Sequence, residues 1–259
     1  MSMYSERKRN LFPILMALVL TGGMWVGMAS AEEASTDVAW TQWGGHDQAF
    51  KADSENLAGK WGENGPAEIW SRDLGEGYSA ILFEHGKLYT MYRADEKEVV
   101  ISLDASSGKT LWTHTYDSSP SEGHVNQFGR GPRGTPLIVG DTIYTIGVAG
   151  MMHALDKKTG KVQWKHDLWG DFDGSFLNHG YSSSPMAYED MVVVLVGGEG
   201  QSVIAFDQKD GSVKWKGGDF GNSYSTPKIY EVGGKPLLIT FMAAELVGME
   251  RATPARPLA

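Results

Sequence analysis

The sequence predicts an all-β protein whose units are the four-stranded antiparallel blades of a β-propeller. Three segments of the 259-residue chain align with one another without gaps, and their tryptophans lie 52 and 51 residues apart. Two further strand-like runs, joined by a short turn, precede each aligned segment. Four strands in about 50 residues, each joined to the next by a turn, is the pattern of a propeller blade.

Each aligned segment holds an aspartate, a glycine four residues later and a tryptophan four residues after the glycine. The aspartate follows a strand and can accept backbone N–H groups in the turn. The glycine supplies the positive φ that closes a short hairpin, and the tryptophan is a large anchor on the next strand. A small residue two positions before the aspartate leaves room for close packing. The structural positions expected from this motif are Asp104, Gly108, Trp112, Asp156, Gly160, Trp164, Asp207, Gly211 and Trp215.

A fourth unit begins but departs from the motif. Glu250 stands at the aspartate position, Pro254 stands where the glycine belongs, and no tryptophan follows. Residues 251–259 are therefore interpreted as an aberrant tail, typical of a truncated or frame-shifted copy of a longer protein. We expect about three and a half blades in an incomplete ring. The expected repeat region is 67–250, with blade units over residues 78–116, 134–168, 183–218 and 224–250.

Residues 67–72 resemble a fourth strand with its tryptophan, Trp70, although no earlier strands precede them. Because closure of a propeller removes exposed sheet edges, we expect this strand to pair into the last blade. A larger ring can close through it, or four blades can close on themselves. Residues 32–66 are expected to form a mostly irregular leader on the surface.

The first 31 residues predict a secretory signal peptide. Positive residues at 7–9 precede an apolar, uncharged run over 11–28, and Ala29-Ser30-Ala31 places small residues at a cleavage site. The alternative is a membrane anchor, because about 18 apolar residues can just span a bilayer. Three glycines within the run weaken that alternative. We expect cleavage after Ala31, export to the periplasm of a two-membrane cell, and no stable membrane span afterwards.

Composition excludes several classes of function. The formal net charge is −9, and a nucleic-acid partner is not expected because phosphate neutralisation needs basic patches. The chain has no cysteine, which excludes a disulfide framework, a thiolate metal site and a cysteine nucleophile. The histidines show no paired metal-ligand spacing, so no metal site is expected from the sequence.

The motif from Ala154 to Trp164 resembles the tryptophan-docking repeat of quinoprotein alcohol dehydrogenases. It equally resembles the wider class of PQQ-like (pyrroloquinoline quinone-like) propeller proteins, which includes a lipoprotein that assists outer-membrane protein assembly. The resemblance implies that the motif tryptophans stack where blades meet and that a complete ring has seven or eight blades. The adjacent cysteine pair of the dehydrogenases and the lipidated cysteine of the lipoprotein are both absent here. No residues match the family's calcium ligands or catalytic aspartate, so catalytic residues stay unassigned.

Polar loops enter the first strand of each blade, and such loops gather at one mouth of a propeller channel. Arginines there can receive an anion, and PQQ is a planar quinone with three carboxylates. PQQ with calcium is a candidate cofactor through the resemblance alone. A purely structural alternative is that the tyrosines and Ser/Thr-Pro pairs recur because they begin the strand. The candidate residues at the mouth are Arg130, Arg133, His179, Tyr181, Asn222 and Tyr224.

Two functional hypotheses follow, and they belong to different classes. The first is an exported PQQ-like propeller that acts as a binding or scaffolding module and holds a protein or a small-molecule ligand. The second is an incomplete copy of a PQQ-dependent dehydrogenase. Because no catalytic residue is recognisable, the sequence favours the first over an enzyme.

Overall fold

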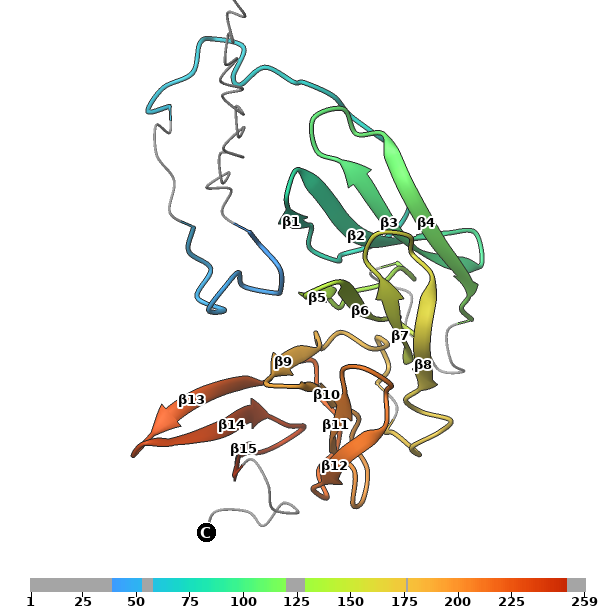
Figure 1. Ribbon diagram of the computed structural model, residues 1–259, viewed down its shortest axis with the longest axis vertical. Helices are drawn as coiled ribbons and strands as arrows, with labels where there is room; N and C mark the ends of the chain where they lie inside the picture. The colour runs from blue at the N-terminus through green and yellow to red at the C-terminus, as the bar shows by residue number, and fades with distance from the viewer. Residues whose placement is uncertain (1–38, 53–57, 120–128, 176, 251–259) are drawn as a thin grey trace, which may run out of the picture. The chain divides into compact units, whose positions relative to one another are not determined.

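The computed structural model describes residues 39–52, 58–119, 129–175 and 177–250, and every regular element in these ranges is a β-strand (Figure 1). The expected signal peptide over 1–31 and the tail over 251–259 lie outside these residues. In the described ranges, no helix has the length and apolar character needed to cross a membrane. The expectation of an all-β chain is confirmed.

The strands form four separate sheets, and in each sheet the strands follow chain order and pair antiparallel. The first sheet consists of β1 (Leu82–Glu84), β2 (Lys87–Ala94), β3 (Lys97–Asp104) and β4 (Thr110–Asp117). The second consists of β5 (Leu137–Val139), β6 (Thr142–Ile146), β7 (Met151–Asp156) and β8 (Val162–Asp167). The third consists of β9 (Met186–Tyr188), β10 (Met191–Leu195), β11 (Val203–Asp207) and β12 (Val213–Gly217). The fourth has three strands, β13 (Lys228–Val232), β14 (Lys235–Phe241) and β15 (Leu246–Glu250).

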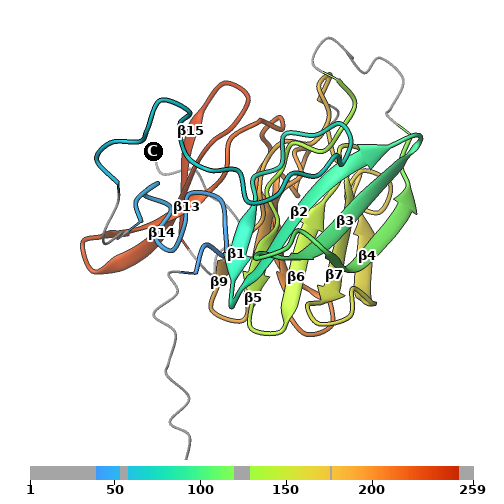
Figure 2. The same cartoon turned by 90° about the horizontal axis from the view of Figure 1, so that it is seen from above.

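Burial along the strands explains how the sheets pack. All five residues of β10 are buried, because the middle of a sheet is covered on both faces. On the outermost strand β4, half-buried and exposed residues alternate, since only one face of that strand meets a neighbour. Apolar clusters join the first sheet to the second, the second to the third and the third to the fourth. The sheets therefore pack face to face in chain order, as Figure 2 shows for the first two.

In the turn between the third and fourth strands of each complete sheet, the glycine N–H donates to the carbonyl of the motif aspartate. The Asp156 carboxylate accepts the backbone N–H of Thr159 at 2.8 Å, and its carbonyl accepts that of Gly160 at 2.8 Å. Gly160 has φ +70°, in the left-handed region that favours glycine. The hydrogen bond from the Thr159 hydroxyl, with those from backbone N–H groups, lowers the pKa of Asp156.

A bulge beside each turn places the motif tryptophan opposite a small residue. The register shifts between Ala154 and Leu155, and at the equivalent points of the first and third sheets. The resulting cross-strand pairs are Ser102 with Trp112, Ala154 with Trp164, and Ala205 with Trp215. A blade of four antiparallel strands, as expected for a β-propeller, is thus present three times, and no sheet closes on itself.

Candidate functional site

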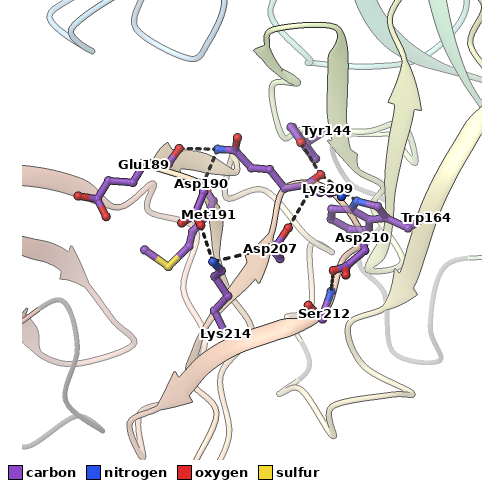
Figure 3. Close-up of polar contacts among 11 residues, drawn as sticks. Tyr144, Trp164, Glu189, Asp190, Met191, Asp207, Lys209, Asp210, Ser212 and Lys214 are labelled. Atoms are coloured by element: carbon purple, nitrogen blue, oxygen red, sulfur yellow. Dashed lines mark hydrogen bonds and ion pairs between the residues drawn. The ribbon is translucent and has the colours of Figure 1, made fainter.

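Tryptophan hydrogen bonds join the first sheet to the second and the second to the third. The Nε1 of Trp112 donates to the Lys157 carbonyl at 2.9 Å, and that of Trp164 donates to the Gln208 carbonyl at 3.1 Å. Figure 3 shows Trp164 and Tyr144 together at one turn of the third sheet, where Tyr144 also donates to the Gln208 carbonyl at 3.0 Å. Each indole ring also lies against the turn glycine of the facing sheet.

Trp215 occupies the same motif position in the third sheet, but it makes no equivalent hydrogen bond to another described residue. Its Nε1 is buried and has no partner within the residues that the structure describes. Its ring packs against the apolar cluster between the third and fourth sheets.

The loops that lead into the first strand of each sheet are joined by one line of contacts. The Arg133 guanidinium carbon lies 5.7 Å from the centroid of the Tyr78 ring, and Arg133 Nη1 donates to the His179 carbonyl. The His179 ring centroid lies 6.0 Å from that of Tyr224, whose hydroxyl donates to Asn178 at 2.7 Å. Side chains from all four sheets therefore meet at one end of the strands. We call these segments the mouth loops, residues 75–78, 129–133, 178–181 and 221–224.

Both arginines of the mouth loops bind groups of the protein itself. Arg130 makes two hydrogen bonds to the Glu96 carboxylate, at 3.0 and 2.7 Å, and this pairing lowers the pKa of Glu96. Arg133 donates to the backbone carbonyls of His179 and Gly129. The charge of Arg130 is thus paired with a carboxylate, whereas Arg133 uses N–H donors on two backbone carbonyls.

Tyr181 and Asn222 differ in their surroundings. Tyr181 is 1% exposed and packs against Trp169, and burial raises the pKa of its hydroxyl. Asn222 is also buried, and its backbone N–H donates to the Ser175 hydroxyl at 2.9 Å. Tyr181 therefore belongs to the core, whereas Asn222 forms part of a pocket wall.

A pocket of about 540 Å³ lies at the mouth loops of the third and fourth sheets. Its walls combine amide and hydroxyl groups with apolar side chains. The lining residues are Leu177, Asn178, Asn222, Ser223, Tyr224, Ser225, Phe241, Met242 and Ala243. No charged side chain is among these described lining residues. Sequence reasoning selected Asn222 and Tyr224 but missed Phe241 and Met242, because Phe241 ends a strand that carries no motif and Met242 follows it.

Comparison with known proteins identifies the family. The family model described as outer membrane protein assembly factor BamB matches residues 95–253. This chain belongs to the PQQ-like repeat family. The resemblance read from the motif, and with it the prediction of a β-propeller repeat fold, is confirmed.

Known members of the PQQ-like repeat family include an enzyme and an assembly factor. Quinohemoprotein alcohol dehydrogenase ADH IIB of Pseudomonas putida is 26% identical over 241 residues, which cover 86% of this chain and 34% of that protein. BamB of Yersinia pestis is 24% identical over 156 residues, covering 58% of this chain and 36% of that protein. The crystal structure of BamB from Moraxella catarrhalis has a TM-score of 0.42 and 19% identity, over 67% of this chain and 45% of that one. The chain thus spans only about a third of these two curated relatives.

The PQQ-like family raises the question of whether the described residues suit PQQ with calcium, and the charged groups expected for both are not gathered at the mouth loops. A calcium ion needs several oxygen ligands, and no group of three or more acidic or histidine side chains gathers in the described ranges. PQQ carries three carboxylates, which bind most strongly to cationic donors. The described pocket lining supplies none, and Arg130 and Arg133 are committed elsewhere.

Sequence reasoning also missed a polar cluster that is buried between the first two sheets. Glu98 is 0% exposed and accepts the backbone N–H of Val148 at 2.9 Å. The His153 ring centroid lies 4.4 Å from that of Tyr116 and 4.9 Å from that of His114. Burial raises the pKa of Glu98 and lowers the pKa of His153 to about 3. Charged forms of these groups are therefore disfavoured between the sheets.

The buried histidine predicts a loss of stability in mild acid. His153 stays neutral in the folded chain down to about pH 3, whereas an unfolded histidine takes up a proton near pH 6.5. Its contribution is therefore present above pH 6.5 and is lost as the pH falls from there toward 3. When the pH is lowered from 7.5 to 5, the fall in the free energy of unfolding should be smaller for His153→Gln than for wild type, by about 2 kcal/mol. Denaturant unfolding at both pH values measures this difference.

Two comparisons isolate the effect of His153. The exposed His46→Gln variant should keep the wild-type pH dependence. Glu98, whose raised pKa acts in the opposite direction, is unchanged in both variants and so cancels in the comparison. Equal pH dependence of wild type and His153→Gln would show that His153 is not shielded from protons.

Proposed function

We propose that this chain is an exported binding or scaffolding module that holds a protein segment at its mouth loops. Residues 1–31 act as a cleaved export signal for the periplasm, and the blades over residues 67–250 form the scaffold. The mouth loops between the third and fourth sheets supply the binding pocket. The third and fourth sheets, whose loops line the pocket, pack together through an apolar cluster that includes Trp215.

The uncharged lining of the pocket carries this proposal. Asn178, Asn222 and Tyr224 present amide and hydroxyl groups, while Phe241 and Met242 present apolar surface. A peptide segment has the same composition, with N–H and C=O groups along the backbone and apolar side chains beside them. A protein segment suits this lining better than an ion or a carboxylate cofactor. Two relatives carry the name outer membrane protein assembly factor, which also supports a protein partner.

Site-specific photo-crosslinking in the organism that encodes the chain tests this proposal. A photoreactive phenylalanine analogue replaces Tyr224, which is 43% exposed in the pocket wall, and the full chain is irradiated in living cells. We expect one covalent adduct with another protein, identified by mass spectrometry. The matched control carries the analogue at Leu111, which is 48% exposed on β4 and outside the pocket. Adducts of equal yield from both positions, or none from Tyr224, would contradict the proposal.

A PQQ-dependent dehydrogenase is the second candidate function. The observation in its favour is the 26% identity to a quinohemoprotein alcohol dehydrogenase across 86% of this chain. The chain covers 34% of that enzyme, and the described residues hold no cluster of three or more acidic or histidine side chains for calcium. We therefore rank it below the binding module.

A further inference from the structure

Three of the four sheets are entered through the same pair of residues, a hydroxyl residue followed by proline. These pairs are Thr135-Pro136 before β5, Ser184-Pro185 before β9 and Thr226-Pro227 before β13. The first sheet has Ala80-Ile81 at this place. Because proline disfavours the helical region for the residue before it, each hydroxyl residue is extended. Its backbone N–H then needs a partner on a neighbouring segment.

The hydroxyl groups of these residues join each sheet to the one before it. The Ala80 N–H donates to the Thr135 hydroxyl at 3.3 Å. The Thr135 N–H donates to the Ser184 hydroxyl at 3.0 Å, and the Ser184 N–H donates to the Thr226 hydroxyl at 3.2 Å. Equivalent positions of all four sheets are thus linked in chain order. We call residues 80, 135, 184 and 226 the hydroxyl ladder.

The hydroxyl ladder is shielded from water. Thr135 and Ser184 are each 2% exposed. A Cβ at Gly134 would lie 2.9 Å from the Ser183 carbonyl oxygen, so the second and third sheets approach closely beside this hydrogen bond. A backbone N–H that is buried in such a place without an acceptor loses its hydration and gains nothing in return. Each hydroxyl therefore holds the N–H of the sheet before it.

The last hydrogen bond of the hydroxyl ladder lies behind the pocket at the mouth loops. The pocket has one wall from residues 177–178, in the loop of the third sheet, and one from residues 222–225 and 241–243 of the fourth. The bond from Ser184 to Thr226 joins the segments that follow these two loops. In front of it, the exposed Tyr224 hydroxyl donates to Asn178 at 2.7 Å. The separation of the two walls is thus held at two points.

We propose that Thr226 is a positioning residue for this pocket, whose hydroxyl sets the separation of the two walls for a bound protein segment. The inference rests on the function proposed above. Thr226 is not one of the lining residues, so it acts through the loops and not by contact with the partner. Walls that are already in place do not have to be ordered when the partner binds, and affinity is higher for that reason.

Amide hydrogen exchange of the full chain, measured by nuclear magnetic resonance, tests the hydrogen bond without any partner. Thr226→Val keeps the shape of the side chain but removes the hydroxyl. We expect the Ser184 N–H to exchange about fivefold faster in this variant. Thr226→Ser keeps a hydroxyl and should retain the wild-type exchange rate. Unchanged exchange of Ser184 in Thr226→Val would overturn the proposal.

Photo-crosslinking in cells tests whether this hydrogen bond serves binding. The photoreactive phenylalanine analogue is placed at Phe241, which lines the pocket and is 57% exposed. Tyr224 and Asn178 then keep their hydrogen bond. For equal amounts of chain, we expect Thr226→Val to lower the adduct yield about fivefold and Thr226→Ser to keep it at the wild-type level.

Thr135→Val is the matched control, because it removes the equivalent acceptor at the junction of the first and second sheets. It should speed the exchange of the Ala80 N–H and leave the adduct yield unchanged. An equal fall in yield in this control would overturn the positioning role, since general stability would then explain both variants. Equal yields from Thr226→Val and wild type would overturn it too, while the binding module stands. No adduct from the wild-type chain would instead contradict the proposed function itself.

Discussion

Replacing Trp164 by alanine is expected to lower the free energy of unfolding by about 3–5 kcal/mol. The ring is 8% exposed and packs between the second and third sheets with Phe206, and its Nε1 donates to the Gln208 carbonyl. Truncation leaves a cavity at the junction and an acceptor with one hydrogen bond fewer. Denaturant unfolding of the full chain, followed by far-ultraviolet circular dichroism, measures the loss.

Trp215→Ala is the matched control, because the residue holds the same motif position. Its Nε1 makes no hydrogen bond within the described residues, and its ring borders a small cavity beside Met191 and Leu238. We expect a smaller loss, of about 1–2 kcal/mol. If Trp215→Ala costs as much as Trp164→Ala, the hydrogen-bonded docking contact is not what distinguishes the two junctions.

Gly160→Ala is expected to cost about 2–4 kcal/mol. A Cβ at this position would lie 2.5 Å from Cε3 of the Trp112 ring, so the ring must move away from the turn. The backbone also has φ +70°, which is unfavourable for alanine. The two penalties act together, and the free energy of unfolding reports their sum.

Gly140→Ala separates the two penalties within the same sheet. Gly140 has φ +56° in the turn between β5 and β6, and a Cβ there would meet nothing within 4 Å. We expect this variant to lose only about 1 kcal/mol, from backbone strain alone. Equal losses at the two glycines would mean that the close approach of Trp112 contributes nothing to stability.

The three complete sheets follow from the sequence because their determinants are local. The aspartate, the glycine and the tryptophan act within one turn and the strand after it, so each copy of the motif predicts its own hairpin. The small residue opposite each tryptophan is equally visible in the sequence. The family resemblance follows from the same positions, since these are the residues that define the repeat.

The buried polar cluster does not follow from the sequence, because it forms only when two sheets pack together. Glu98 stands at the start of an apolar run, and the sequence pattern predicts that a charged residue there lies at the exposed end of a strand. Val148 covers it from a loop of the second sheet, some fifty residues along the chain. No local pattern links the two positions, and the same holds for His114 and His153.

The mouth loops, too, could be predicted only in part from the sequence. Recurrence before each first strand locates the loops but not the direction of each side chain. Tyr181 points into the core and Tyr224 into the pocket, although both follow a glycine-containing loop in similar positions. Arg130 lies beside Glu96 because the two loops meet in space, and this contact decides whether its charge can serve a ligand.

Titration of the full chain with PQQ in the presence of calcium is the most direct test of a binding module against a quinone enzyme. Quinone absorbance and tryptophan fluorescence are followed to saturating cofactor. The uncharged described lining of the pocket and the committed arginines predict no saturable change in either signal. A saturable change that requires calcium would contradict the account, because it would reveal a cofactor site that the described residues do not provide.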